Sequence, residues 1–103
     1  MDIGLFQLEN LIHSNIRFNF LDLRQSFKPI PPELELVVSR GIKLGATRAR
    51  DYLTHEKLSK DSPVILLSED GAFARTTSLE LESLGYKNIY VIVDGVEGLL
   101  SEL

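Results

Sequence analysis

The sequence predicts one α/β domain over residues 1–103, with three α/β/α layers and a mainly parallel sheet of about five strands. Residues 64–67 and 89–93 are almost continuous apolar runs, which are typical of strands that are covered on both faces. A helical pattern with short connections lies between them, and this order favours parallel strands joined by a crossover helix. A chain of 103 residues also has the usual length of a single domain.

The chain starts with a helical pattern that is followed by a short strand pattern. Leu5, Leu8 and Ile12 recur at positions i, i+3 and i+7, which predicts an amphipathic helix over residues 5–14. Residues 18–23 form a short, mostly apolar run that includes a carboxylate near its end. We therefore predict the first strand of the sheet over these residues.

Prolines mark the next connection. The segment 28–32 contains three prolines, which exclude both a helix and a central strand. Pro32 suits the first position of a helix, and this predicts a short helix over residues 33–40. A candidate strand over residues 42–44 follows and stops at Gly45.

The second half of the chain alternates helices and strands more clearly. We predict a modest helix over residues 48–59, and Pro63 closes the connection to the next strand. The following helix ends at Gly85, since glycine commonly terminates helices. Its apolar stripe consists of Phe73, Thr77, Leu81 and Leu84. After the last strand, Asp94-Gly95 turns the chain into a final short helix.

Composition excludes several classes of protein. Hydrophobic residues make up 44% and charged residues 25% of the chain, as in soluble globular proteins. No apolar run has the ~20 residues of a membrane span, and the start lacks a signal-peptide pattern, so we expect a cytoplasmic protein. A net charge of −4 argues against a general nucleic-acid binder. The absence of cysteine excludes disulfides and thiolate metal sites.

Polar residues lie where three predicted strands end. Asp22, Ser68 and Asp94 each stand at or directly after the carboxyl end of a strand. In parallel sheets these ends share one edge, and ligands bind beyond it. The sequence therefore predicts a candidate site at this edge.

Short motifs at the connections also follow one another in a fixed order. The motifs are Asp22-Leu23-Arg24, Gly45-Ala46, Gly85-Tyr86, Asn88-Ile89-Tyr90-Val91 and, in the closing turn, Asp94, Gly95 and Leu99. This order resembles that of single-domain rhodanese-like (sulfurtransferase) proteins. The resemblance covers most of the chain and is most specific from Ser68 to Leu99. It implies a rhodanese-like fold.

The resemblance further implies that the loop after residues 64–67 is a degenerate active-site loop. Family members place a catalytic cysteine straight after this strand, in a loop of the type cys-arg-ser-gly-x-arg-ser. The corresponding residues here are Ser68, Glu69, Asp70, Gly71, Ala72, Phe73 and Ala74. The loop keeps only the glycine, because Ser68 replaces the cysteine and Glu69 and Phe73 occupy the two arginine positions.

These departures argue against the family's chemistry. Sulfur transfer needs a thiolate to carry the sulfur, with N–H groups and arginines to stabilise the anion. Ser68 cannot hold a transferable sulfur, and Glu69 and Asp70 place negative charge where an anionic substrate should sit. We therefore expect no sulfur or phosphoryl transfer, no catalytic residues, no cofactor and no metal.

The expected function is that of an interaction or regulatory module. Its partner, a protein or a small molecule, would bind the former active-site edge, the proline-rich loop or both, and a homodimer stays open. The alternative is an enzyme for an unrelated hydrolysis, which uses Ser68 or a cation held by Glu69 and Asp70 together with Asp22 or Asp94. A response-receiver fold is a third hypothesis. That fold requires a lysine after one of the later strands, whereas Lys87 precedes the last predicted strand.

Each prominent residue also has a structural interpretation. We expect Ser68 to bond to loop N–H groups, the acids after it to be solvated near a helix N-terminus, and Asp22 and Arg24 to be structural partners. Phe73 is either a core residue or an exposed anchor. His13 and His55 are lone histidines in helical patterns, and metal binding is not expected of either without a second ligand at a suitable spacing. The four clustered basic residues are interpreted as a solvated face, with an anionic partner as the alternative: Arg40, Lys43, Arg48 and Arg50.

Overall fold

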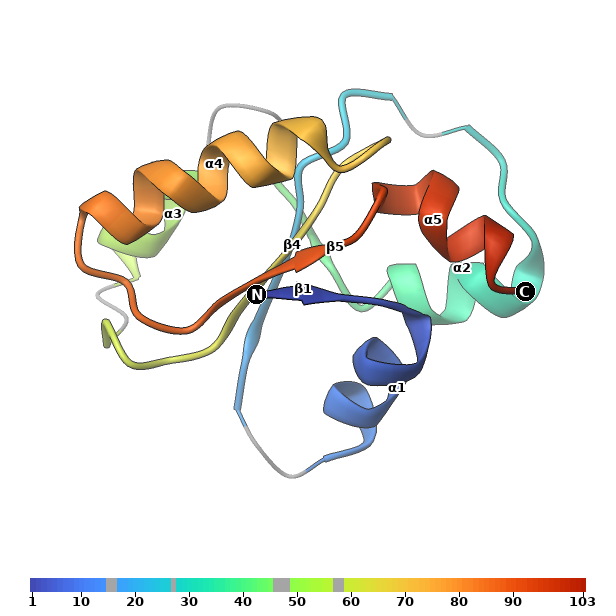
Figure 1. Ribbon diagram of the computed structural model, residues 1–103, viewed down its shortest axis with the longest axis horizontal. Coiled ribbons are helices and arrows are strands. Elements are labelled where there is room, and N and C mark those ends of the chain that lie inside the picture. Colours follow the sequence, from blue (N-terminus) through green and yellow to red (C-terminus); the bar gives the residue numbers. More distant parts are fainter. Residues whose placement is uncertain (15–16, 27, 46–48, 57–58) are drawn as a thin grey trace.

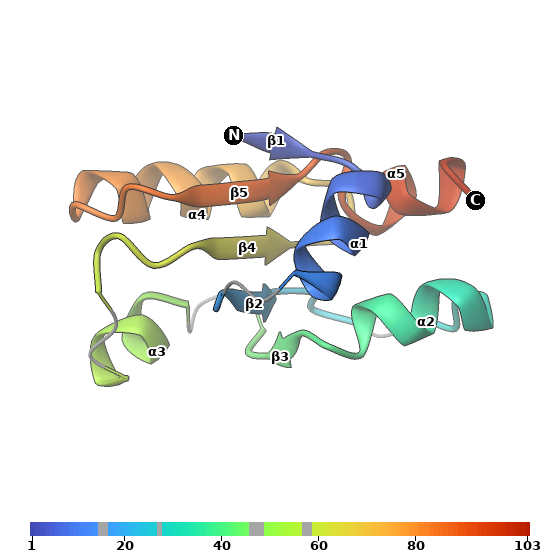
Figure 2. The same cartoon turned by 90° about the horizontal axis from the view of Figure 1, so that it is seen from below.

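A five-stranded, all-parallel sheet forms the centre of the protein in the computed structural model, which describes residues 1–14, 17–26, 28–45, 49–56 and 59–103. The strands are β1 (Asp2–Ile3), β2 (Asn19–Asp22), β3 (Ile42–Lys43), β4 (Val64–Leu67) and β5 (Ile89–Ile92), in the spatial order β1-β5-β4-β2-β3. The helices are α1 (Leu5–His13), α2 (Pro32–Val38), α3 (Ala49–His55), α4 (Ala72–Ser83) and α5 (Gly95–Ser101). Figure 2 shows the strands side by side and pointing the same way.

Helices cover both faces of this sheet, so the predicted three-layer α/β/α fold is confirmed. Helices α1, α2 and α5 pack on one face, and α3 and α4 pack on the other (Figure 1). The central strand β4 shows why its sequence is apolar throughout. Ile65 and Leu67 point into the first layer, Val64 and Leu66 point into the second, and all of them are fully buried.

The strand β1 was not predicted from the sequence. It has only two residues, and it pairs with β5 at the register Asp2↔Val91. The carbonyl oxygens of Met1 and Ile3 accept hydrogen bonds from the N–H groups of Val91 and Val93, at 2.8 and 2.9 Å. A strand this short has no recognisable alternation, and its partner lies almost ninety residues away in the chain.

The predicted element boundaries are close to those observed. Pro32 opens α2 as expected, and α4 is terminated by Gly85, whose φ of +98° favours glycine. The strand β3 is one residue shorter than predicted, and α3 is described from Ala49 to His55 within the predicted range of 48–59. No helix built from the described residues is long and apolar enough to cross a membrane.

Candidate functional site

The candidate site lies where β2, β4 and β5 end side by side. Asp22 is paired in register with Leu67, so that Ser68 emerges directly beyond it at the same edge. The turn that follows β5 reaches the same place, because the N–H group of Val96 donates to the carbonyl oxygen of Ser68 at 2.9 Å. The structure therefore brings Asp22, Ser68 and the Asp94 turn to one edge.

Ser68 is fully buried inside its own loop. Its Oγ accepts hydrogen bonds from the N–H groups of Gly71 and Ala74, at 3.1 and 3.2 Å. These are the loop N–H groups at the start of α4, which in an open loop are available to bind an anion. The hydroxyl of Ser68 thus occupies the interior of the loop and acts as a structural acceptor.

The loop is also fixed against the closing turn by close backbone packing. Gly71 has a φ of +92°, and a Cβ at this position would lie 3.0 Å from the backbone nitrogen of Asp94. At Gly95, whose φ is +60°, a Cβ would collide with the carbonyl oxygen of Ser68 and lie 2.7 Å from the carbonyl carbon of Glu69. Both glycines are therefore required by the approach of the two loops.

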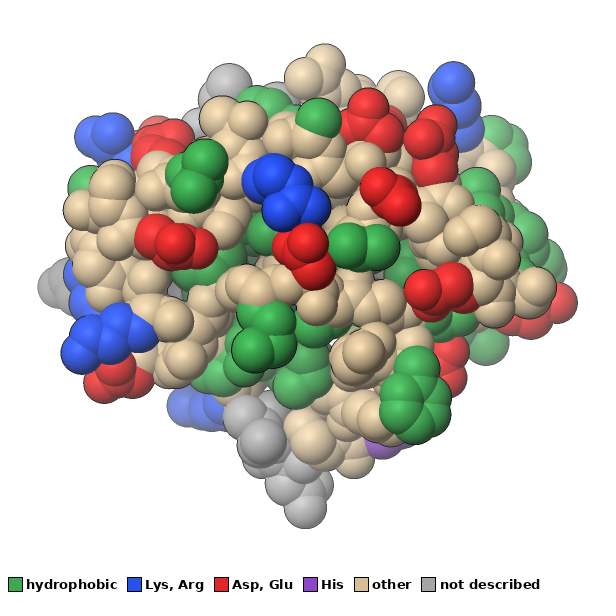
Figure 3. All heavy atoms as spheres, viewed as in Figure 1, with side chains coloured by type: hydrophobic (Ala, Val, Ile, Leu, Met, Phe, Trp, Pro, Cys, Tyr) green, Lys and Arg blue, Asp and Glu red, His purple; other side chains and the backbone are tan. Residues whose placement is uncertain are grey.

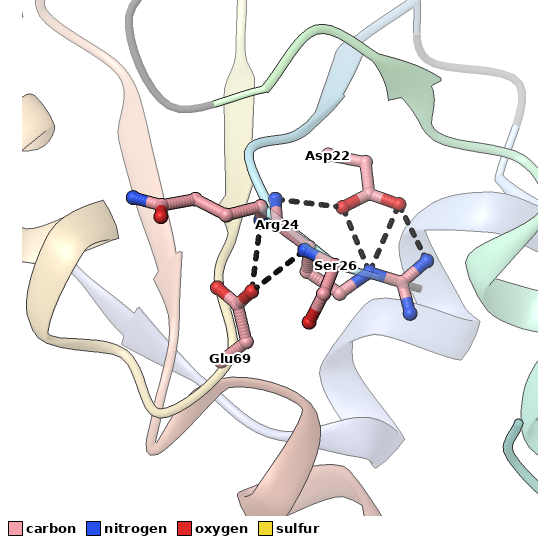
Figure 4. Close-up of polar contacts among 5 residues, drawn as sticks. Asp22, Arg24, Ser26 and Glu69 are labelled. Carbon is pink, nitrogen blue, oxygen red and sulfur yellow. Dashed lines mark hydrogen bonds and ion pairs between the residues drawn. The ribbon is translucent and has the colours of Figure 1, made fainter. Parts of the chain in front are cut away.

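Asp22 and Arg24 form a buried ion pair beside this loop. The Nη2 atom of Arg24 lies 2.7 Å from Oδ2 of Asp22, and its Nε lies 2.9 Å from Oδ1 (Figure 4). The Asp22 carboxylate is fully buried, and Arg24 is only 5% exposed. The hydrogen bond to Asp22 raises the pKa of Arg24 above its ordinary value, although burial acts in the opposite direction. The guanidinium is thus committed to a neighbouring carboxylate.

Glu69 differs from the sequence-based expectation of a solvated acid near a helix N-terminus. Its side chain is half-buried, and its Oε2 accepts hydrogen bonds from the N–H groups of Gln25 and Ser26, at 2.8 and 3.1 Å (Figure 4). Glu69 therefore fixes the segment after β2 to the loop after β4. Asp70 is exposed and accepts a hydrogen bond from the N–H group of Ala72 at 3.0 Å, at the start of α4.

The carboxylates of the edge do not converge on a common point. Asp22 is bonded to Arg24, Glu69 to the segment after β2, and Asp70 to the first turn of α4. In the part of the chain that the structure describes, no three His, Asp or Glu side chains are grouped to hold a metal ion. His13 and His55 are exposed in the last turns of α1 and α3, which run back toward the opposite edge of the sheet.

The other singled-out residues lie away from the edge or pack in the core. Phe73 is half-buried and packs against the apolar cluster between the sheet and the α3–α4 layer, as expected of a core residue. Arg40, Lys43 and Arg50 are exposed near α2, β3 and α3, and Arg50 lies 3.7 Å from Glu80. Ala46 and Arg48 lie outside the described residues.

A hollow of about 250 Å³ opens next to the loop, and it was not predicted from the sequence. Its walls come from the segment after β2, the loop after β4 and α5. The lining residues are Arg24, Ser26, Lys28, Pro29, Ile30, Glu69, Val96, Glu97 and Leu100. In the view of Figure 3, acidic side chains gather on the half of the molecular surface where α5 lies. Val96 and Leu100 stand at positions i and i+4 of α5, and this spacing could have predicted that both lie on one side of the helix.

Comparison with known proteins adds no family to this description. No protein-family model matches the sequence, and a search of curated proteins finds no significant match. The resemblance to the rhodanese-like family stays a prediction that rests on the short motifs.

Proposed function

We propose that this chain is a rhodanese-like domain without sulfurtransferase activity, which acts as an interaction or regulatory module through the carboxyl edge of its sheet. One observation carries the proposal. Ser68, at the place of the family's catalytic cysteine, is fully buried, and its Oγ accepts hydrogen bonds from two N–H groups of its own loop. A side chain held in this way is a part of the scaffold and has no access to a substrate.

The surrounding groups support the loss of sulfur and phosphoryl transfer. An anionic substrate needs free N–H donors or cations, but the N–H groups of Gly71 and Ala74 are bonded to Ser68. The guanidinium of Arg24 is bonded to Asp22, and Glu69 adds a negative charge to the same edge. An anion that entered here would meet more repulsion than attraction.

The hydrolase alternative has less support. A serine nucleophile needs a positioned base, and the two histidines lie on the last turns of helices that run away from this edge. A catalytic cation needs several converging oxygens, whereas Asp22, Glu69 and Asp70 are each bonded elsewhere. We therefore place the domain among non-enzymes.

The hollow beside the loop supports the interaction role. It combines apolar walls from Ile30, Val96 and Leu100 with charged groups at its margin, which is the composition of a recognition surface. The acidic margin argues against nucleic acid as the partner. We propose a protein or small-molecule partner in the cytoplasm, and a second copy of the chain is the less favoured alternative.

An activity screen tests the enzymatic part of the proposal. The purified protein is expected to show no thiosulfate:cyanide sulfurtransferase turnover above a blank, with a sulfurtransferase of known activity as the positive control. A phosphatase and esterase screen with chromogenic substrates should be equally flat. Turnover that disappears in the Ser68→Ala variant would overturn the proposal.

A further inference from the structure

The hollow beside the degenerate loop continues into an exposed apolar surface. Ile30, Val96 and Leu100 line it, and Leu100 is 39% exposed on the outer side of α5. Leu103 lies one turn further along and is 57% exposed. An apolar hollow with an exposed apolar continuation is characteristic of a surface that binds another chain, because a small ligand would cover only the hollow.

Carboxylates surround this apolar surface. Glu69 and Glu97 line the hollow, and the exposed Asp70 and Asp94 lie on the two loops that meet next to it. Helix α5 carries Glu97 one turn before Leu100, so that an acidic and an apolar side chain lie next to each other on its outer side.

The basic groups of the hollow do not balance these acids. Arg24 is bonded to both carboxylate oxygens of Asp22, and the charges of Glu35 and Glu69 act on it as well. Among the described residues that line the hollow, Lys28 is the other basic one. Acidic side chains therefore outnumber the uncompensated basic ones around the hollow, which favours cationic groups over anionic ones.

We propose that this surface docks a segment of a partner protein that carries an aliphatic side chain beside lysine or arginine side chains. The aliphatic side chain enters the hollow between Ile30, Val96 and Leu100, and the basic side chain faces Glu97. This inference rests on the proposed function, and it goes further by defining the chemistry of the partner. Burial of apolar surface supplies affinity, while the acidic margin selects basic segments over acidic ones.

Two matched peptides test this proposal on the whole chain. One fluorescein-labelled peptide alternates leucine and lysine, and in the other, glutamate replaces every lysine. Binding is measured by fluorescence anisotropy, and its location by amide shifts in ¹H–¹⁵N spectra of the protein. The lysine peptide is expected to bind at least roughly tenfold more tightly than the glutamate peptide and to shift the amides of Val96, Glu97 and Leu100.

Variants of α5 separate specific docking from general attraction. Leu100→Ser is expected to weaken the lysine peptide roughly tenfold, and the exposed Glu97→Gln roughly three- to fivefold. The matched controls are Leu79→Ser and Glu80→Gln on α4, which packs on the opposite face of the sheet. Both control variants should leave the affinity unchanged, since Leu79 is 66% exposed and the contact of Glu80 with Arg50 is long and exposed.

The outcomes distinguish this inference from the proposed function. If both peptides bind the hollow equally and Leu100→Ser weakens both, the edge is a docking surface, but the preference for a basic segment is wrong. Preference for the glutamate peptide, equal loss in the α4 controls, or no shift of the α5 amides would each overturn the inference. None of these results bears on the absence of sulfurtransferase activity, which the turnover assay decides independently.

Discussion

The backbone of Gly95 lies against the carbonyl oxygen of Ser68, so closely that no side chain fits between them. The adjacent N–H group of Val96 donates to the same carbonyl oxygen at 2.9 Å, and that of Glu97 donates to the carbonyl oxygen of Glu69 at 3.2 Å. The loop after β4 is thus held from outside by the closing turn and from inside by the hydroxyl of Ser68. A loop fixed from both sides is a rigid structural element.

Replacement of Gly95 by alanine tests this packing. The new Cβ would collide with Ser68, and the positive φ is unfavourable for alanine, so that Gly95→Ala should lower the free energy of unfolding by about 3 kcal/mol. Gly45→Ala is the matched control, because Gly45 has a φ of +75° but no atom of the described residues lies within 4 Å of the added Cβ. It should cost only about 1 to 2 kcal/mol, from the positive φ alone. Equal losses in urea denaturation would contradict the account of the two loops.

The buried ion pair predicts a large effect for Arg24. Arg24→Ala leaves Asp22 buried without its partner, and the free energy of unfolding should fall by about 3 to 5 kcal/mol. Arg75→Ala removes a pair of similar chemistry with Asp2, but that pair is about half exposed and should contribute at most about 1 kcal/mol. Thermal denaturation of both variants makes the comparison, and an equally small loss for Arg24→Ala would show that the buried pair is unimportant.

The same pair also predicts how this contribution depends on pH. The pKa of Arg24 is raised in the folded state, so its contribution is complete below the unfolded pKa and is lost only as the pH rises through the folded pKa. Both pKa values lie far above neutrality, as is usual for a guanidinium. Arg24 therefore stays charged between about pH 6 and pH 9, and its contribution to stability should be constant across this range. The test measures the free energy of unfolding of the wild type and of Arg24→Ala across this range. A difference between the two that changes with pH because Arg24 titrates would contradict this prediction.

Glu69 predicts a local effect on the segment after β2. Its carboxylate accepts two backbone N–H groups, so Glu69→Ala should destabilise the protein by about 2 kcal/mol and accelerate hydrogen exchange at Gln25 and Ser26. Glu97→Ala is the control, because Glu97 is an exposed acid of the same edge. Unchanged exchange at Gln25 and Ser26 in Glu69→Ala would show that this contact does not order the segment.

Local patterns explain how much of the fold could be predicted. The runs that became β4 and β5 are recognisable because both faces of each strand are covered, and Gly85 and Pro32 mark helix ends by their own backbone preferences. The strand β1 has two residues and depends on a partner at the far end of the chain, so no local pattern reveals it.

The site shows the same division between local and long-range information. The carboxyl edge and the pairing of Asp22 with Arg24 follow from strand ends and from a separation of only two residues. The contact of Glu69 joins segments more than forty residues apart, and the hollow is assembled from three elements. These features depend on how the connections pack in space, which the sequence pattern of one chain does not specify.

The Ser68→Cys variant is the most direct test of the proposal that this loop does not support sulfurtransferase chemistry. Its thiosulfate:cyanide sulfurtransferase turnover should be compared with that of the wild type and a blank, after far-UV circular dichroism shows that it is folded. We expect no turnover, because the residue at this position is fully buried, the guanidinium of Arg24 is paired with Asp22, and Glu69 opposes an anion. Strong turnover would contradict it, since the loop would then be intact except for its nucleophile.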